Sequence, residues 1–237
     1  MIPKVIHYCW FGGNPLPNSA QKCIASWRKY LPDYEIKEWN ESNFDVNIIP
    51  YTAEAYKAKK YAFVSDYARF WILYKYGGLY FDTDVEVIKN MDDIIAKGPF
   101  MGCENEAKPG AMPAELGVAP GLGLGVKPGL RLYGEILEIY KDKHYILPDG
   151  SYSPETVVTI TSDLLCKYGL KNINDIQVVA GVVIYPKEYF CPKDYKTGIL
   201  ELSERTVSIH HYDASWLNKK KKFKLFAKKI FRKYIKR

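Results

Sequence analysis

Residues 76–84 read Tyr-Gly-Gly-Leu-Tyr-Phe-Asp-Thr-Asp, and this stretch decides the fold class. The two glycines end a helical pattern, the apolar centre is typical of a short buried strand, and the aspartates follow at its carboxyl end. In open α/β sheets, ligands bind outside the carboxyl ends of the strands. The stretch therefore predicts a helix–strand unit that delivers two carboxylates to a binding edge.

The surrounding sequence alternates between helical and extended patterns. Before the glycines, Phe63, Tyr67, Phe70, Trp71 and Tyr74 recur at helical spacing and form one apolar stripe. We expect strands at 5–11, 34–39, 79–81, 85–88, 176–179, 182–185 and 205–211, helices at 52–60, 129–141 and 154–168, and a helix capped by Asn18 or Ser19 that runs to about residue 30. This alternation predicts an α/β fold with a mainly parallel central sheet.

Charge divides the chain into two parts. The 237 residues carry a net charge of +7, but residues 1–216 hold 23 basic and 27 acidic side chains, whereas residues 217–237 hold 11 basic ones and no acid. The hydrophobic content of 47% and the mean hydropathy of −0.26 exclude a disordered chain and a multi-span membrane protein. We expect one domain over residues 1–216, which does not bind nucleic acid, and a basic tail over residues 217–237.

The tail has the pattern of a basic amphipathic helix. Large apolar side chains, including Phe223, Phe226, Ile230 and Phe231, gather on one side of a helical wheel, and lysines fill most of the other. Each basic residue near an anionic lipid surface adds about 1 kcal/mol of binding free energy. The tail therefore predicts attachment to an anionic membrane. A solvated tail is the plainer interpretation, and a nucleic-acid-binding arm leaves the apolar stripe unexplained.

The cysteines and the first residues indicate location. Five cysteines are scattered without a C-x-x-C pair, which is typical of free thiols in a reducing compartment. The first residues show no signal-peptide pattern, and no run approaches the roughly 18 apolar residues of a membrane span. We expect a cytoplasmic protein that is peripheral on the inner face of the cell membrane.

The aspartate pair has three interpretations. Asp82 and Asp84, two positions apart at a bend, can converge on Mg²⁺ or Mn²⁺, which use carboxylates together with substrate phosphates. The interpretation without a function is a pair of loop carboxylates that are exposed to solvent. A third is the D-x-D-x-T/V motif of aspartate-nucleophile phosphatases, which Val85 completes. That family usually places its motif on the first strand, and here about eighty residues precede it.

A second polar pair lies on the preceding helix. Asp66 and Arg69 are three positions apart and share one helix face near its start. They form either an ion pair on a wet face or a site for sugar hydroxyls and phosphate oxygens. Because Phe63, Tyr67 and Phe70 flank them, we expect this face to be at least partly covered.

Together these motifs resemble glycosyltransferase family 32. The resemblance rests on S-D-x-x-R at 65–69 and Y-G-G-x-Y-x-D-x-D at 76–84, on the opening 2–12, and on a closing H-x-x-x-x-S-W at 210–216. The family includes bacterial capsular and lipopolysaccharide transferases and yeast initiating α-mannosyltransferases, and the large clostridial glucosylating toxins share its core. The resemblance implies a GT-A fold, a single nucleotide-sugar-binding domain with the D-x-D loop at its centre.

The resemblance also implies roles for individual residues. Trp10 would stack on the nucleotide base, Tyr80 would approach the sugar or phosphate, and Asp66 and Arg69 would contact the donor sugar and diphosphate. Asp82 would hold the metal, partly through water, and the ribose, whereas Asp84 would bind the metal directly. Asp66, Arg69 and Asp84 are accordingly the predicted catalytic residues.

The closing motif adds further candidates. His210 and His211 are both possible metal ligands, but neighbours in a strand point to opposite faces, so only one should reach the metal, and His210 fits the motif. Ser215 and Trp216 would close over the β-phosphate as neutral hydrogen-bond donors.

The function implied is transfer of a hexose from a nucleotide sugar, with retention of configuration and with Mn²⁺ or Mg²⁺. UDP is the preferred carrier, and the acceptor would be a growing, lipid-linked cell-surface polysaccharide or oligosaccharide. The stretch 101–129 would form the acceptor cleft, and Glu104 or Glu106 could lie near the acceptor. The alternatives are the phosphatase and a non-catalytic membrane-associated adaptor, which leaves the three motifs unexplained.

Overall fold

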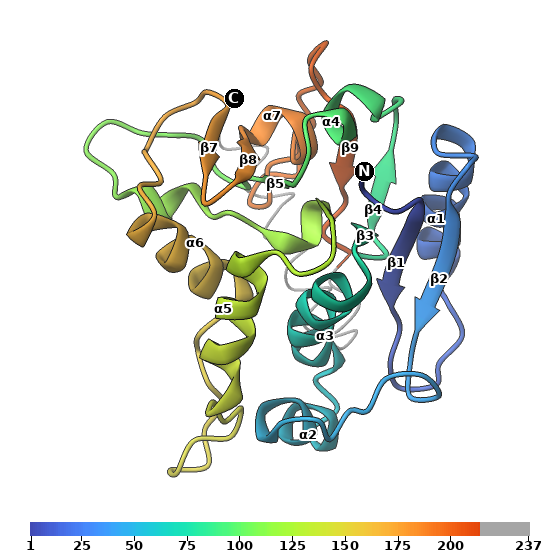
Figure 1. Cartoon of the computed structure of the whole chain (residues 1–237), viewed down its shortest axis with the longest axis vertical. Coiled ribbons are helices and arrows are strands. Elements are labelled where there is room, and N and C mark those ends of the chain that lie inside the picture. Colours follow the sequence, from blue (N-terminus) through green and yellow to red (C-terminus); the bar gives the residue numbers. More distant parts are fainter. Residues whose placement is uncertain (214–237) are drawn as a thin grey trace.

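A computed structural model describes residues 1–213, and its architecture is a sheet covered by helices (Figure 1). The strands are β1 (Val5–Cys9), β2 (Glu35–Trp39), β3 (Gly78–Tyr80), β4 (Val85–Val87), β5 (Phe100–Gly102), β6 (Leu124–Val126), β7 (Gln177–Val179), β8 (Val182–Tyr185) and β9 (Ser208–His210). The helices are α1 (Asn18–Tyr30), α2 (Pro50–Lys57), α3 (Tyr61–Tyr76), α4 (Asp92–Ala96), α5 (Arg131–Lys141), α6 (Val157–Lys167) and α7 (Lys187–Phe190), with short 3₁₀ turns η1 (Pro113–Leu116) and η2 (Pro120–Leu122).

The central sheet has seven strands in the order β2-β1-β3-β6-β5-β8-β7. Strands β2, β1, β3, β5 and β8 run in one direction, and β6 and β7 run in the other. A separate antiparallel pair, β4 and β9, joins the D-x-D loop to residues more than 120 positions later. The expected α/β fold with a mainly parallel sheet is confirmed.

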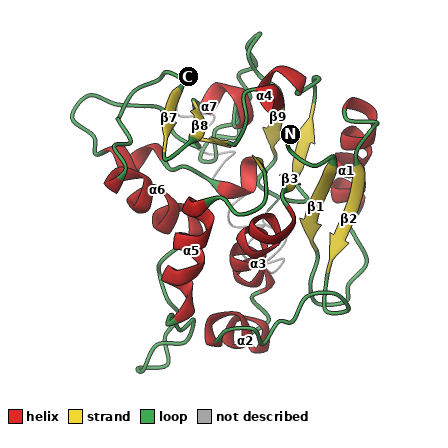
Figure 2. Cartoon of the chain, in the orientation of Figure 1, coloured by secondary structure: helices red, strands yellow, loops and turns green. Residues whose placement is uncertain are grey.

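Two clusters of buried hydrophobic side chains pack between this sheet and the helices, whose arrangement Figure 2 shows. Neighbouring residues of one strand enter different clusters: Leu79 packs towards α1, whereas Tyr80 packs towards α3, α5 and α6. Side chains in a strand alternate between faces, so a sheet with helices on both sides needs apolar residues at successive positions. Of the predicted apolar stripe of α3, Phe70 and Tyr67 are buried, whereas Tyr74 is 39% exposed. Val64 and Leu73, outside that stripe, are fully buried.

Gly77 and Gly78 fit α3 closely to the sheet. Both have positive φ angles, 65° and 102°. A Cβ atom at Gly78 would lie 2.6 Å from the carbonyl oxygen of Val5, and one at Gly77 would lie 2.6 Å from the ring of Pro128. The two glycines therefore turn the chain from helix to strand where no side chain fits.

Several element ends differ from the sequence-based expectations. Neither Asn18 nor Ser19 caps α1, because Asn18 is already its first residue and Pro17 precedes it. Helix α6 begins at Val157 because the Thr156 hydroxyl accepts a hydrogen bond from the Thr159 amide. Within residues 1–213, no helix has the length and apolar character needed to cross a bilayer.

Candidate active site

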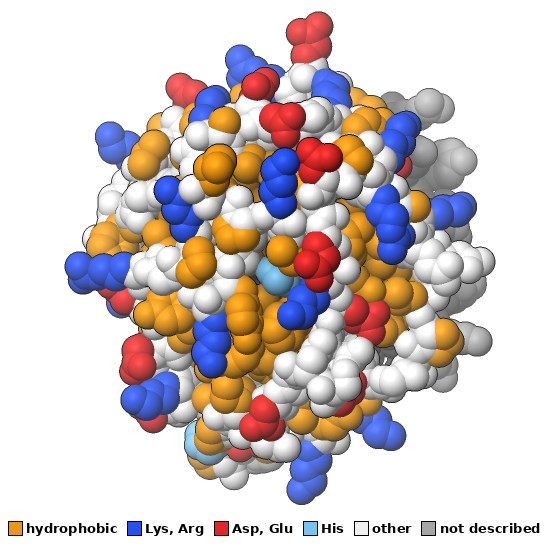
Figure 3. All heavy atoms as spheres, turned by 45° about the vertical axis from the view of Figure 1, so that its right-hand side comes forward, with side chains coloured by type: hydrophobic (Ala, Val, Ile, Leu, Met, Phe, Trp, Pro, Cys, Tyr) orange, Lys and Arg blue, Asp and Glu red, His pale blue; other side chains and the backbone are white. Residues whose placement is uncertain are grey.

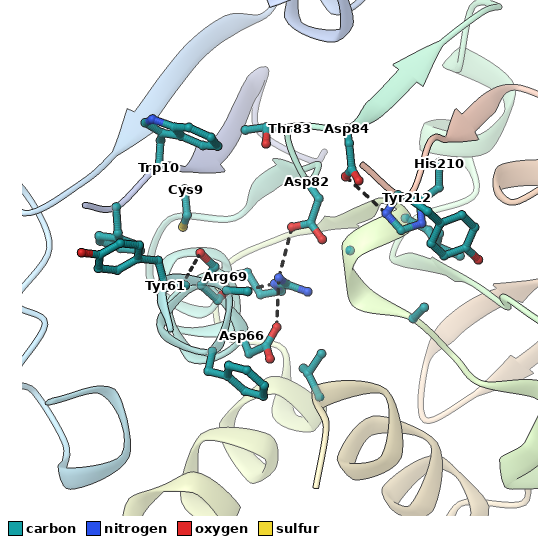
Figure 4. A pocket seen from close by; sticks show the side chains of 18 of the residues that line it. Cys9, Trp10, Tyr61, Asp66, Arg69, Asp82, Thr83, Asp84, His210 and Tyr212 are labelled. Carbon is teal, nitrogen blue, oxygen red and sulfur yellow. Dashed lines mark hydrogen bonds and ion pairs between the residues drawn. The ribbon is translucent and has the colours of Figure 1, made fainter. Parts of the chain in front are cut away.

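A cleft of about 600 Å³ lies at the edge where β1, β3 and β5 end. Its lining includes Trp10 after β1, Asp82 after β3, residues of α3 and Tyr212 after β9 (Figure 4). Glu104, which follows β5, also lines it. Parallel strands bring their carboxyl ends to one edge, so residues far apart in the sequence meet there. On the face seen in Figure 3, basic and acidic side chains are interspersed rather than gathered into a basic stripe.

Arg69 is the centre of the first charged group, which we call the Arg69 centre: Ser65, Asp66, Arg69, Tyr80 and Asp82. Its Nη2 lies 3.1 Å from Oδ1 of Asp66 and 3.1 Å from Oδ1 of Asp82. The Arg69 Nε donates to the carbonyl of Ser65 at 3.2 Å, and the Tyr80 hydroxyl donates to Asp82 at 3.1 Å. The Arg69 guanidinium thus contacts both Asp66 of the S-D-x-x-R motif and Asp82 of the D-x-D motif.

The Arg69 centre is covered rather than wet. The side chains of Arg69 and Asp66 are only 4% and 12% exposed. Burial raises the pKa of Asp66 to about 7, although the guanidinium of Arg69 acts in the opposite direction. The pair is therefore covered, as expected, and is not an ion pair on a wet face; its role in binding sugar or phosphate stays a prediction.

The second charged group is the Asp84–His210 pair. The pairing of β4 with β9 sets Val85 opposite His210, and Nε2 of His210 lies 3.2 Å from Oδ1 of Asp84. The backbone amide of Asp213 donates to the other carboxylate oxygen at 2.9 Å. Burial alone would raise the pKa of Asp84, but His210 and the hydrogen bonds lower it to about 2. Burial would likewise lower the pKa of His210, but Asp84 raises it to about 10.

The structure separates the two candidate histidines. His211 points away from Asp82 and Asp84, and its Nε2 lies 2.7 Å from a carboxylate oxygen of Glu86. His210 instead faces the carboxylates, so the metal-binding candidates reduce to Asp82, Asp84 and His210. Successive strand residues point to opposite faces, which explains the difference.

The remaining three candidates can together hold a divalent ion. Asp82, Asp84 and His210 each offer one ligand atom, and these atoms lie within 4.8 Å of one another. The two carboxylates suit Mg²⁺ and Mn²⁺ alike, and the imidazole favours Mn²⁺ because Mg²⁺ takes oxygen ligands. A substrate oxygen can complete the coordination in this open cleft. The donor set therefore fits the implied metal.

Trp10 and Tyr61 form the aromatic end of the cleft (Figure 4). Trp10 follows β1 directly, is half-buried, and donates through Nε1 to the carbonyl of Asn14 at 2.6 Å. Gly12 has a φ of 95°, and a Cβ atom there would lie 2.3 Å from the Tyr61 ring. An indole held by this hydrogen bond beside the cleft can offer its face to a flat base.

Sequence reasoning missed Gly121 and Tyr212, which also line the cleft. Gly121 lies against Asp82: its carbonyl accepts from the Asp82 amide at 3.1 Å, and a Cβ atom there would lie 2.1 Å from Asp82 Oδ2. Tyr212 has a φ of 56°, and its ring centre lies 4.2 Å from that of His210. Its hydroxyl lies 2.9 Å from the Cys191 sulfur. In the sequence, Gly121 is indicated only by the glycine-rich run 121–125, and Tyr212 only by its closeness to His210.

Ser215, Trp216 and the tail 217–237 lie outside the described residues. Their predicted contacts with the β-phosphate and the membrane stay predictions. The five cysteines are free thiols, four of them buried.

Comparison with known proteins finds similarity to glycosyltransferases over part of the chain. Residues 17–101 match the family model described as a glycosyltransferase sugar-binding region containing a DXD motif. Inositol phosphoceramide mannosyltransferases 3 and 1 of Schizosaccharomyces pombe are 33% and 30% identical over 98 and 111 residues. An uncharacterized glycosyltransferase of Acanthamoeba polyphaga mimivirus is 34% identical over 106 residues. These matches cover 40–42% of this chain and 27%, 33% and 42% of the three relatives.

Two solved structures share the fold. PaToxG glycosyltransferase superposes with a TM-score of 0.50 and 19% identity, covering 70% of this chain and 69% of its own. A glycosyltransferase involved in the glycosylation of the major capsid of PBCV-1 gives a TM-score of 0.52 and 12% identity, covering 95% of this chain and all of its own. The fold is therefore the GT-A type that the resemblance implied.

Proposed function

We propose that this protein transfers a hexose from a nucleotide sugar to a hydroxyl group, with retention of configuration and with a divalent metal ion. One observation carries the proposal: a single cleft holds an aromatic end at Trp10, a buried cation at Arg69, and the cluster of Asp82, Asp84 and His210. A nucleoside diphosphate sugar presents a flat base, an anionic diphosphate and a sugar, which are the kinds of group that these three parts of the cleft can contact.

The metal-binding part would consist of Asp82, Asp84 and His210. A bound Mn²⁺ or Mg²⁺ would neutralise charge that develops on the departing diphosphate. Asp84 is held ready for this role because the amide of Asp213 fixes one of its oxygens at 2.9 Å. His210 carries a proton when no metal is bound, so metal binding would release that proton.

The donor-binding part would consist of Trp10 and the Arg69 centre. Trp10 would stack on the base, and Arg69, already placed by Asp66 and Asp82, would face the diphosphate or the sugar hydroxyls. Because these groups are fixed before the donor binds, they stabilise developing charge without having to reorganise. Tyr80 would hold the Asp82 carboxylate in position.

Retention is consistent with a front-face reaction. The acceptor hydroxyl would attack from the side of the departing diphosphate, and positioning and charge stabilisation would supply most of the catalysis. Ser215 and Trp216, as in the resemblance, would donate hydrogen bonds to the leaving group.

Mannose is the first donor sugar to test, because two relatives are named mannosyltransferases. Their names also specify a ceramide lipid as acceptor, which supports a lipid-linked acceptor here. We retain UDP as the first carrier to test, with GDP beside it. A lipid acceptor would also explain a basic tail that holds the enzyme on the inner face of the membrane, with a capsular or lipopolysaccharide glycan as product.

A donor screen tests the proposed function. The full chain is incubated with UDP- and GDP-hexoses and Mn²⁺, and binding and sugar release are measured with and without EDTA. We expect one donor to bind and to be hydrolysed slowly only when metal is present. Release of phosphate from simple phosphomonoesters without any nucleotide sugar would favour the phosphatase, and absence of nucleotide binding would favour the adaptor.

Vesicle cosedimentation tests the tail. A chain that lacks residues 217–237 should no longer sediment with anionic vesicles, whereas the full chain should, and added salt should weaken its binding. Full cosedimentation of the truncated chain would contradict membrane attachment by the tail.

A further inference from the structure

The topology of the sheet sets the order of functional residues across the cleft. Strands β1, β3 and β5 are parallel to one another and lie in the order β1-β3-β6-β5. Trp10 follows β1, and Asp82 and Glu104 are each the second residue after β3 and β5. All three side chains line the same cleft. If the donor extends from Trp10 to Asp82, Glu104 lies beyond its reactive end.

The backbone holds Glu104 firmly at this position. Its amide donates to the carbonyl of Gly117 at 2.9 Å, and the preceding Cys103 amide donates to Tyr185 at 2.9 Å. Gly117, with a φ of 61°, leaves the side chain room, because a Cβ atom there would lie 2.8 Å from Glu104 Cγ. The side chain is therefore placed by the sheet edge and not by a flexible loop.

Glu104 differs in its polar contacts from the other acidic side chains of the cleft. The acidic side chains that line it are Asp66, Asp82, Asp84 and Glu104. Arg69 holds the first two, and His210 and the Asp213 amide hold the third. Among residues 1–213, no hydrogen bond or ion pair includes the Glu104 carboxylate. Burial raises its pKa, and the nearby His210 partly opposes this.

We propose that Glu104 is a catalytic residue that accepts a hydrogen bond from the attacking hydroxyl of the acceptor. This inference rests on the proposed sugar transfer and goes beyond it by assigning the acceptor side of the cleft. The hydroxyl oxygen forms the new bond to the sugar carbon, the bond from that carbon to the diphosphate breaks, and the hydroxyl proton passes along its hydrogen bond to the Glu104 carboxylate, which later returns it to water. Glu104 orients the hydroxyl and forms no bond to the sugar.

Glu106 offers a matched control on the same segment. It is two residues further on, its side chain is 62% exposed, and its carboxylate lies 3.7 Å from Nζ of Lys187. It lines a separate surface hollow and not the cleft of Asp82 and Asp84. A substitution there alters charge near the segment without touching the proposed acceptor position.

The experiment compares E104Q, E104A and E106Q in the full chain. Two quantities are measured: Mn²⁺-dependent hydrolysis of the donor found in the screen, with water as acceptor, and the Kd of UDP in the presence of Mn²⁺. We expect E104Q and E104A to lower kcat by roughly 10-fold and 100-fold, because a misplaced attacking group forfeits orientation. Their UDP Kd should stay within about twofold, and E106Q should match the wild type in both quantities.

The outcomes separate this inference from the proposed function. Wild-type hydrolysis rates in E104Q and E104A overturn the role of Glu104 and leave the proposed function intact. Loss of UDP binding in these variants places Glu104 on the donor side and also overturns it. A wild-type chain that binds and hydrolyses no donor contradicts the proposed function itself. Unchanged thermal unfolding in E104Q excludes loss of the fold as the cause of reduced turnover.

Discussion

The Arg69 centre and the Asp84–His210 pair lie in the same cleft but are built in different ways. The Arg69 centre comes from residues 65–82, and its cation is a guanidinium that never loses its charge. The Asp84–His210 pair joins strands that are distant in the sequence, and its positive partner is an imidazole. One centre has a permanent counter-charge, whereas the other has one that a metal ion can replace.

This difference teaches how two carboxylates two residues apart can have separate tasks. Asp82 is held by Arg69 and Tyr80, which fix its position. Asp84 is held by a proton-bearing histidine and a backbone amide, which keep it ionised. Asp84 can exchange its partner His210 for a metal ion because an imidazole can lose its proton, whereas the Arg69 guanidinium beside Asp82 cannot.

The largest expected effect comes from disrupting the Asp84–His210 pair. Asp84→Ala should reduce metal-dependent donor turnover by roughly 100-fold to 1,000-fold, because transition-state charge loses its stabilisation. The fold should survive, as judged by circular dichroism, since Asp84 lies at the cleft. Turnover near the wild-type level with Mn²⁺ would contradict the metal assignment.

Disrupting the Arg69 centre should lower the stability of the fold as well as the activity. Arg69→Ala leaves Asp66 and Asp82 without their buried cation and should lower the free energy of unfolding by about 3–5 kcal/mol. Urea unfolding at neutral pH measures this loss. Arg131→Ala is the control, because that arginine side chain is 86% exposed and its replacement should leave the stability nearly unchanged. Equal stabilities for the two variants would show that the Arg69 centre does not support the fold.

A histidine outside the cleft sharpens the contrast with His210. His7 is buried, its Nε2 donates to the carbonyl of Gly77, and its Nδ1 accepts from Trp39. Burial lowers its pKa to about 4, so the unfolded chain binds a proton first as the pH falls. Stability should be complete above about pH 6.5 and decrease towards pH 4, by about 2 kcal/mol between pH 8 and pH 5.

Urea unfolding at several pH values, with wild type and His7→Gln, checks this dependence. The variant should lose the part of the pH dependence that His7 contributes. A wild-type curve that parallels the variant across this range would show that His7 is not held neutral by the fold.

The smallest expected effect concerns the support of Asp82. Gly121→Ala would place a methyl group 2.1 Å from Asp82 Oδ2 and push the carboxylate aside. We expect UDP affinity with Mn²⁺ to fall by roughly 10-fold, as when a residue that orients a metal ligand is changed. Gly134→Ala in α5 is the control, because the added Cβ meets only the edge of the half-exposed Tyr74 ring at 3.3 Å. Unchanged affinity in Gly121→Ala would mean that Asp82 adapts freely.

The local parts of the fold and site could be predicted from the sequence. The apolar stripe of α3, the two glycines after it and the aspartates at the end of β3 all depend on neighbours within a few residues. The pairing of Asp66 with Arg69 follows from helical spacing. The opposite directions of His210 and His211 follow from strand geometry.

The remaining parts depend on contacts between distant segments. Nothing near Gly121 in the sequence shows that Asp82 presses against it, and nothing near Glu104 shows that β5 ends at the cleft while Glu106 turns to Lys187. The sequence pattern predicts that this helix begins at residue 154, whereas α6 begins at Val157, after a cap in which the Thr156 hydroxyl accepts from the Thr159 amide. Contacts between distant segments, which cannot be read from local sequence, thus determine where these side chains lie and where α6 begins.

The pairing of β4 with β9 has a consequence for how the protein is made. Asp84 leaves the ribosome early and can fold with α3 and β3, but His210 and the Asp213 amide are synthesised roughly ten seconds later at usual elongation rates. Until then the nascent chain has the Arg69 centre without its metal-binding partner strand. A translation product that stops before β9 would therefore lack His210 and the Asp213 amide, so its Asp84 would have neither of these partners.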